Sequence, residues 1–335
     1  MKKYIVLLLL LASIANSQEV SKVGTTAAKF LSIPVSPRAL GMGGAFVSVA
    51  DDPSAMYWNA AGAARLVQNE LLFDHAQWFA DIGFNYAAIV MPFGTAGNIG
   101  INVTSMTTGQ MDVTTETSPE GTGESFAASS YAFGFTYAKN LTEWFSIGSN
   151  VKYVTEKIWH SSSSGVGIDI GTLFNTPFSG IRFGASISNF GSKLHISGQD
   201  LLVQKDIDPS QNGNNPATNA YLATEEFDMP LNLRIGISKD FISNDDQRLI
   251  LAIDASQPND NTENVNVGGE YQFLGKMLSV RGGYKALFMQ DSPERFTVGG
   301  GLNQRFDNRQ VKFDYAFEAY DRLSGVHKFS FGILF

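Results

Sequence analysis

Side chains that commonly carry catalysis or bind metals are few in this chain and widely spaced. The four histidines are His75, His160, His195 and His327, and no two of them have the spacing of a metal site. Residues 161–164 are a run of serines, but the sequence places no base beside them to form a nucleophilic site. The chain has no cysteine, which excludes disulfides, thiolate zinc sites and cysteine nucleophiles. These patterns predict neither an enzyme nor a bound cofactor.

Two acidic segments hold oxygen atoms of the kind that calcium prefers. Asp206 and Asp208 stand in one of them, and residues 257–264 form the other. Neither segment has the ligand spacing of a known calcium loop, so both are interpreted as solvated loops.

The most unusual composition lies in the segment 37–62, PRALGMGGAFVSVADDPSAMYWNAAG. A phosphate loop would need a strand before its glycines and a Lys-Ser or Lys-Thr pair after them, and both are missing. Glycine permits tight backbone packing, and the Asp-Pro-Ser turn favours the start of a helix. The segment is therefore predicted to pack inside a larger cavity, either as a plug that closes a pore or as a surface that contacts a ligand. The residues of this motif are Gly41, Gly43, Gly44, Asp51, Asp52, Pro53, Tyr57, Trp58, Asn59 and Gly62.

Charged residues of the C-terminal third recur at every second position, the period of a β-strand with one apolar face. In residues 311–319 the charges stand at even positions and the large apolar groups at odd ones. In residues 278–288 the expected apolar face is Leu278, Val280, Tyr284, Ala286 and Phe288. The charges predicted to face the interior are Arg234, Glu270, Arg281, Lys285, Arg305, Lys312, Asp314 and Glu318, together with Lys152, Glu156, Asp169, Arg182, Asp254 and Lys328. Both signs are mixed, which fits either an ion-pair network that holds the shape of the molecule or a charged path for a polar solute.

The elements that position these groups are strands over nearly the whole chain. About fourteen are predicted, at 70–79, 82–93, 97–106, 127–139, 143–158, 165–175, 181–190, 231–241, 247–256, 263–273, 277–288, 295–306, 309–319 and 326–335. An even number is typical of single-chain bacterial outer-membrane barrels. The predicted fold is an all-β, transmembrane antiparallel barrel with an N-terminal plug segment in its lumen.

The connections between these strands differ in length according to whether they follow an odd-numbered or an even-numbered strand. Those after even-numbered strands are short, whereas residues 107–126, 159–164, 191–230 and 257–262 form longer connections after odd-numbered strands. This asymmetry predicts short turns and both termini on the periplasmic side, with the long loops outside. The glycines at 299–301 are a candidate kink in the twelfth strand.

Composition supports export to a membrane. Of the 335 residues 17% are charged, below the roughly 25% of a typical soluble domain, and 33 are glycine. The net charge of −8 argues against a nucleic-acid partner. Residues 1–17 have the basic start, apolar stretch and small terminal residues of a signal peptide. The expected organisation is a signal peptide at 1–17, a plug segment at 18–66 and an outer-membrane barrel at 67–335, in which the terminal aromatic Phe335 acts as an assembly signal.

The stretch from Arg38 to Gly62, RALGMGGAFVSVADDPSAMYWNAAG, resembles the N-terminal signature of PorV/PorQ-type outer-membrane proteins. It is similar, more loosely, to the superfamily of the long-chain fatty-acid transporter FadL. Ala60 stands where the usual motif has proline. The resemblance implies a FadL-like barrel with its N-terminal segment in the lumen, and a link to subunits of the type IX secretion translocon and to secreted proteins.

Three functions follow as hypotheses. The first is an interaction component of type IX secretion, a partner or shuttle for secreted substrates. The second is a FadL-like transporter of hydrophobic small molecules across the outer membrane. The third is a purely structural barrel that stabilises other components of that membrane. Membrane lipid is an expected partner in each case.

Overall fold

The structure is a computed structural model. It describes residues 22–335 except 178, 209, 212, 214, 216, 290 and 291. The expected signal peptide, residues 1–17, lies outside the described residues.

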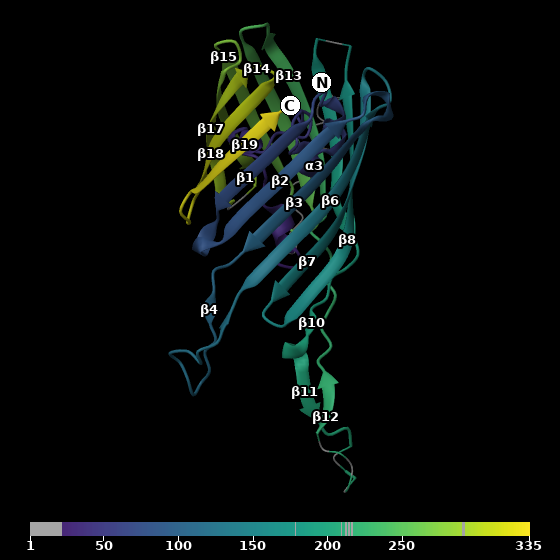
Figure 1. The fold of residues 1–335 in the computed structure, drawn as a ribbon, viewed down its shortest axis with the longest axis vertical. Helices are drawn as coiled ribbons and strands as arrows, with labels where there is room; N and C mark the ends of the chain where they lie inside the picture. Colours follow the sequence, from purple (N-terminus) through teal and green to yellow (C-terminus); the bar gives the residue numbers. More distant parts are fainter. Residues whose placement is uncertain are drawn as a thin grey trace, which may run out of the picture.

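Fourteen antiparallel strands form a closed barrel in which each strand pairs with its neighbours along the chain (Figure 1). The barrel closes where β8 pairs with β9 and β1 with β19. The fourteen strands are β1 (Glu70–Gln77), β2 (Gly83–Pro92), β3 (Asn98–Thr107), β6 (Ala128–Asn140), β7 (Phe145–Ile158), β8 (Ser161–Asn175), β9 (Ile181–Gly191), β13 (Asn232–Ser243), β14 (Arg248–Pro258), β15 (Asn264–Phe273), β16 (Leu278–Leu287), β17 (Glu294–Phe306), β18 (Arg309–Tyr320) and β19 (Val326–Leu334). Each predicted strand overlaps one of these, so the predicted fold is confirmed.

In β18 and β19 the alternation of the sequence places large apolar side chains on the outer face of the barrel and charged ones inside. In β18, Phe313 is exposed on the outer face, while Glu318 is fully buried within. In β19, Phe329 is exposed and Lys328 is buried. An outer face of exposed aromatic and branched residues suits the hydrocarbon of a bilayer, in which a closed barrel leaves no backbone group unpaired.

One predicted face is wrong at the end of β16. Ala286, expected beside Tyr284 on the apolar outer face, is buried. The register of β15 against β16 shifts between Val265 and Val267, and Ala286 has a φ of 51°. A bulge adds a residue to one strand, so the side chains beyond it change face.

The long connections gather at the end of the barrel opposite the C-terminus (Figure 1). They carry the two-stranded pairs β4 (Met111–Asp112) with β5 (Ser125–Phe126), and β11 (Leu202–Lys205) with β12 (Thr218–Tyr221), as well as β10 (Ser197–Gly198) and η5 (Gln199–Leu201). One predicted long connection, residues 159–164, is instead a tight turn, because β8 begins at Ser161 and pairs with the end of β7. The short turns hold η4 (Gly94–Ala96) at the other end, while η3 (Phe79–Asp81) lies in the β1–β2 turn at the long-loop end.

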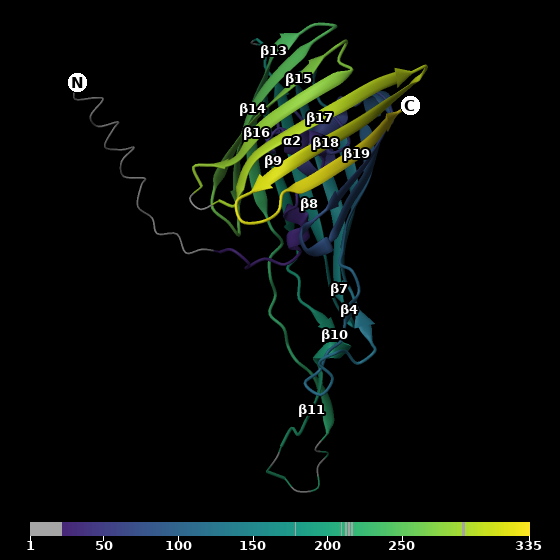
Figure 2. The ribbon, with the colours of Figure 1, turned by 90° about the vertical axis from the view of Figure 1, so that its left-hand side faces the viewer.

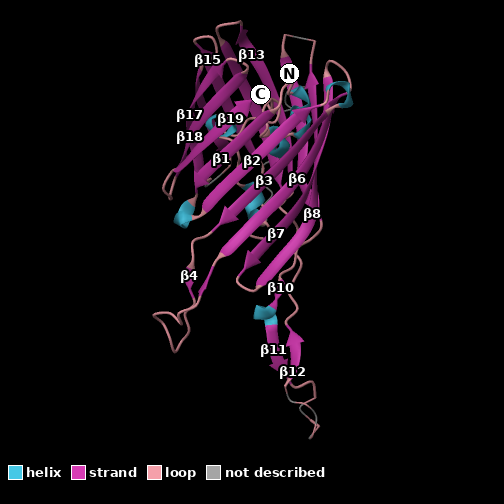
Figure 3. Cartoon of the chain, viewed as in Figure 1, coloured by secondary structure: helices cyan, strands magenta, loops and turns pink. Residues whose placement is uncertain are grey.

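The described residues before β1 run through the lumen rather than across its periplasmic mouth (Figures 2 and 3). They form η1 (Lys29–Ser32), α2 (Pro37–Gly41), α3 (Ala55–Trp58) and η2 (Ala60–Arg65). Ala27 donates its N–H to the carbonyl of Asp228, beside the long-loop end of β13, whereas Asn98 at the short-turn end of β3 bonds to the carbonyl of Leu66. Residues 27–34 therefore lie toward the long-loop end, away from the short-turn end at which the sequence predicts both termini.

The hydrophobic core lies between this segment and the inner wall. Phe46, Met56 and Trp58 of the segment pack with Phe84 and Tyr86 of β2. Among the described residues, none of the helices is long and apolar enough to cross a bilayer.

Deletion of Phe335 is expected to lower the assembled fraction of the barrel without changing the finished fold. Phe335 is exposed and makes a single backbone bond, to the carbonyl of Asn69, so the finished barrel depends on it little. The assembled fraction is measured on gels, where the folded, unboiled barrel is expected to migrate apart from the boiled chain. Normal assembly of the deletion variant would rule out an assembly role, and identical migration of both forms would argue against a closed barrel.

Candidate functional site in the barrel lumen

The N-terminal segment lies with its backbone directly against glycines of the barrel wall. A Cβ atom on Gly283 of β16 would overlap the backbone of Met42 and Gly43, and one on Gly268 of β15 would overlap the carbonyl of Met42. Gly43 itself has a φ of 66°, a conformation that side chains other than glycine rarely adopt. The glycines on both sides therefore permit a contact distance that no other residue allows.

Among the glycines at 299–301, Gly299 has the same role, and the expected kink is wrong. The pairing of β17 with β18 runs without a break through Gly299, Gly300 and Gly301, and its irregularity lies earlier, between Glu294 and Thr297. A Cβ on Gly299 would lie 3.3 Å from the Cα of Gly41, so this glycine makes room for α2. Gly301 instead leaves room for the wall side chains of Ser279 and Asp314.

Two polar side chains hold the backbone of the segment. Asn59 donates to the carbonyls of Val47 and Thr172, both at 2.9 Å, and accepts from the N–H of Ala61 at 3.2 Å, so it caps η2 and binds the wall at once. Asp254 of β14 accepts the N–H groups of Phe46 and Val47 at 2.7 and 2.8 Å. Asn59 belongs to the predicted motif, and Asp254 to the predicted inward charges.

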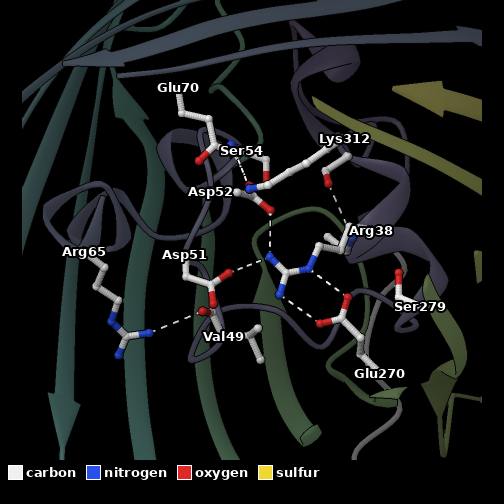
Figure 4. Close-up of polar contacts among 12 residues, drawn as sticks. Arg38, Val49, Asp51, Asp52, Ser54, Arg65, Glu70, Glu270, Ser279 and Lys312 are labelled. Atoms are coloured by element: carbon white, nitrogen blue, oxygen red, sulfur yellow. Dashed lines mark hydrogen bonds and ion pairs between the residues drawn. The ribbon is translucent and has the colours of Figure 1, made fainter. Parts of the chain in front are cut away.

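Arg38 is the centre of a buried ion-pair network between the segment and the wall (Figure 4). Its guanidinium donates to Asp51 Oδ1 at 2.5 Å and to Asp52 Oδ2 at 3.2 Å, and it binds both oxygens of Glu270 at 3.0 and 2.9 Å. Burial alone would raise the pKa of Asp51, but the neighbouring guanidinium of Arg38 holds it well below its ordinary value. The network is thus charged at neutral pH.

The wall extends this network around the short-turn half of the lumen. Arg281 donates to Glu270 Oε1 and to Asp314 Oδ1, both at 2.7 Å. Lys312 binds Glu70 Oε1 at 2.7 Å. Four of the charged residues predicted to face inward belong to this network, namely Glu270, Arg281, Lys312 and Asp314. Two others, Lys285 and Glu318, pair with each other nearer the long loops. Arg305 differs from them, because it is exposed at the end of β17 and makes no ion pair with any described residue.

The long-loop half of the lumen is less completely filled and contains a cavity of about 490 Å³. Its aromatic lining consists of Tyr57 and Trp58 of the motif together with Trp78 and Tyr320, which no motif in the sequence marks. Polar side chains also line the cavity. The amide groups come from three strands, β9, β13 and β15, and from the β14–β15 loop, namely Asn189, Asn232, Asn261, Asn264 and Asn266.

Two further hollows lie between this cavity and the outside. The first, about 410 Å³, shares Met106 with the cavity and lies beside Ala27. The second, about 930 Å³, shares Lys157, His195, Ile196 and Thr224 with the first and opens among the long loops.

Ser161 and Ser162, the first two residues of the serine run, line the outer hollow. Ser161 donates to Asp200 Oδ2 at 2.7 Å, and His160 Nδ1 lies 3.2 Å from Asp200 Oδ1. The carboxylate thus faces both side chains, and in the described part of the chain no hydrogen bond joins Ser161 to the imidazole of His160. Because a serine nucleophile needs a base to take its proton, this group lacks the arrangement of a catalytic site.

A model of an uncharacterised protein family, UPF0164, matches residues 10–245. The chain belongs to this family. No curated protein matches it.

Among solved structures this UPF0164 chain is similar to outer-membrane transporters. With the toluene transporter TbuX of Ralstonia pickettii it shares 13% identity and a TM-score of 0.54, over 89% of this chain and 96% of that one. For the toluene transporter TodX of Pseudomonas putida the identity is 13% and the TM-score 0.55, over 88% and 96%. For a FadL homologue of Pseudomonas aeruginosa they are 12% and 0.53, over 90% and 98%. At such identities the likeness shows a shared barrel fold.

Substituting Gly283→Ala is expected to destabilise the barrel by about 1–3 kcal/mol, because the new methyl group would overpack the contact with Met42 and Gly43. Gly282→Ala, one residue earlier in the same strand, is the matched control, since a Cβ there meets no atom within 4 Å. The temperature at which the unboiled gel band disappears measures the effect. Equal temperatures for the two variants would contradict close packing of the segment against the wall. Leucine at Gly43 or Gly44 is expected to act in the same direction as Gly283→Ala.

Proposed function

We propose that the chain is an outer-membrane transporter that admits small, largely apolar molecules from the outside into its lumen. In this proposal residues 1–17 are removed as a signal peptide, residues 18–66 form the plug, and residues 67–335 form the barrel. The fold is shared with proteins described as toluene transporters, which supports the proposal.

The observation that carries it is the series of hollows at the long-loop end. Molecules that enter among the loops meet first a hollow of about 930 Å³, then one of about 410 Å³, and then the lumen cavity of about 490 Å³. Cavities of this size, with aromatic walls and a few polar groups, are typical binding sites for small organic molecules.

The proposed plug separates these hollows. Phe30 and Leu31 of η1 are buried against Val154 and Met229, between the middle hollow and the cavity. Lys29 binds Asp260 Oδ2 at 2.6 Å and fastens the segment at the mouth. Passage into the cavity therefore requires residues 27–33 to move, whereas the short-turn half stays closed by the Arg38 network.

A reversible cross-link tests this directly, because the chain has no cysteine of its own. In Ala27→Cys/Asp228→Cys a disulfide would join residues whose backbones already share a hydrogen bond of 3.0 Å. We expect the oxidised double variant to take up a hydrophobic fluorescent dye more slowly than the reduced one, in cells and in vesicles. Each single-cysteine variant is the control for oxidation alone. Uptake that is equal in the oxidised and reduced states would contradict entry past this segment.

Deleting residues 25–62 should convert a closed barrel into a conducting one, because a fourteen-strand lumen is too wide for its own side chains to fill. Planar-bilayer recording compares the deletion with the full chain. Equal, low conductance would show that another part of the chain seals the pore.

An interaction role in type IX secretion is the second candidate function, and it rests on the PorV/PorQ-like stretch at 38–62. The loop between β9 and β13 favours it, because this loop extends beyond the barrel and exposes Ile207, Tyr221 and Leu222. Affinity purification from native membranes should then recover translocon subunits or secreted proteins. If neither is recovered, the interaction role is rejected and transport remains as the proposed function.

A further inference from the structure

Three cations line the lumen cavity, and they differ in how their charge is balanced. Lys29 is paired with Asp260 at 2.6 Å, and Lys285 with Glu294 at 2.7 Å. Arg234 makes no ion pair with any carboxylate of the described chain, although it is only 8% exposed. Buried charges are normally paired, so this arginine needs an explanation of its own.

The surroundings of Arg234 stabilise the cation without using up its donors. The guanidinium carbon lies 5.4 Å from the ring centre of Tyr57 and 5.3 Å from that of Trp58. Such ring faces attract a cation, but they leave the N–H groups at the guanidinium edge free for planar acceptors. Its hydrogen bond to Ser188 Oγ is long, at 3.4 Å.

The Tyr57 hydroxyl adds a second donor beside the guanidinium. Burial raises the pKa of this phenol, and the nearby Arg234 opposes the rise without cancelling it, so the hydroxyl stays protonated at neutral pH. A carboxylate held at this point would accept hydrogen bonds from both groups, and bonds between two charged partners are the strong ones.

The shape of the apolar surface limits what can be attached to that carboxylate. Tyr57, Trp58, Trp78 and Tyr320 supply aromatic wall surface, and five asparagines also line the cavity. A long acyl chain would extend over these amides and deprive them of hydrogen bonds, which is costly in a buried site. A compact ring that lies against the aromatic wall would leave more of the amides solvated.

We propose that the lumen cavity binds ring-bearing organic carboxylates, with the anionic group on Arg234 and Tyr57 and the ring on the aromatic wall. The proposal rests on the proposed use of this cavity in transport and names the class of molecule that it takes. A mainly uncharged hydrocarbon would leave the Arg234 guanidinium without a hydrogen-bonded anion.

The test measures quenching of tryptophan fluorescence in the purified full-length barrel, since Trp58 and Trp78 both line the cavity. Benzoate, toluene and laurate are titrated as an aromatic carboxylate, its uncharged analogue and an acyl carboxylate. We expect benzoate to bind more tightly than the other two, and R234Q to weaken its binding about tenfold or more. R305Q is the matched control, because it removes the same charge from an exposed arginine at the far end of the lumen.

R234K keeps the charge but loses the planar fork, so it should bind benzoate with an affinity between those of the native chain and R234Q. The shift of the unboiled gel band shows whether each variant is folded. If R234Q does not fold, the benzoate affinity of R234K is compared with that of R305Q instead. Equal benzoate affinity in these two variants would overturn the proposal.

Other outcomes separate the two proposals. Toluene binding as tight as benzoate binding, unchanged in R234Q, would overturn the carboxylate site and leave the transporter proposal intact. Tighter binding of laurate than of benzoate would overturn the ring-bearing class. Failure of all three compounds to bind the native chain would overturn the proposed carboxylate site. Dye uptake by the Ala27→Cys/Asp228→Cys variant would still test the transport proposal separately.

Discussion

A lumen bounded by fourteen strands is wider than side chains can fill, and the fold depends on how that space is occupied. The chain fills it with its own backbone, which passes along the inner wall at distances that exclude a Cβ. Gly268 and Gly283 on the wall and Gly43 on the segment are parts of one contact, and a side chain at any of them would separate the two surfaces. Several glycines of the wall are thus required to admit a segment made of short helices and turns.

Close backbone contact brings peptide groups and charges into a place with little water, where each needs a partner. The wall supplies these partners from alternate strand positions. Asp254 accepts two N–H groups of the segment, and the two oxygens of Glu270 accept from Nε and Nη2 of Arg38. The inward charges therefore serve the segment in the short-turn half of the lumen. Arg234, in the half that holds the cavity, has no such partner.

Local pattern was sufficient to predict the strands, because side chains that alternate between lipid and lumen leave a period of two in the sequence. The same logic failed at Ala286, where a bulge changes the face and no local signal marks it. The glycines at 299–301 were misinterpreted for a related reason. Glycine in a strand fits both a kink and a close approach, and only the position of Gly41 decides between them. The course of the N-terminal segment through the lumen could not be predicted from the sequence, because it depends on contacts such as that of Lys29 with Asp260, which lies 231 residues away in the chain.

The two halves of the segment are held by interactions of unequal strength, and this inequality sets where the lumen can open. Arg38 is almost fully enclosed, so displacing it would leave several charges buried without partners, which is strongly unfavourable. Lys29 has a side chain that is 55% exposed, and ion pairs in such positions contribute about 1 kcal/mol or less. Phe30 and Leu31 add burial worth roughly 1.5–3 kcal/mol each. In the proposed transport, residues 27–33 are therefore the part whose release costs least while α2 and η2 remain in place, and their release would open the lumen toward the long loops and leave it closed toward the short turns.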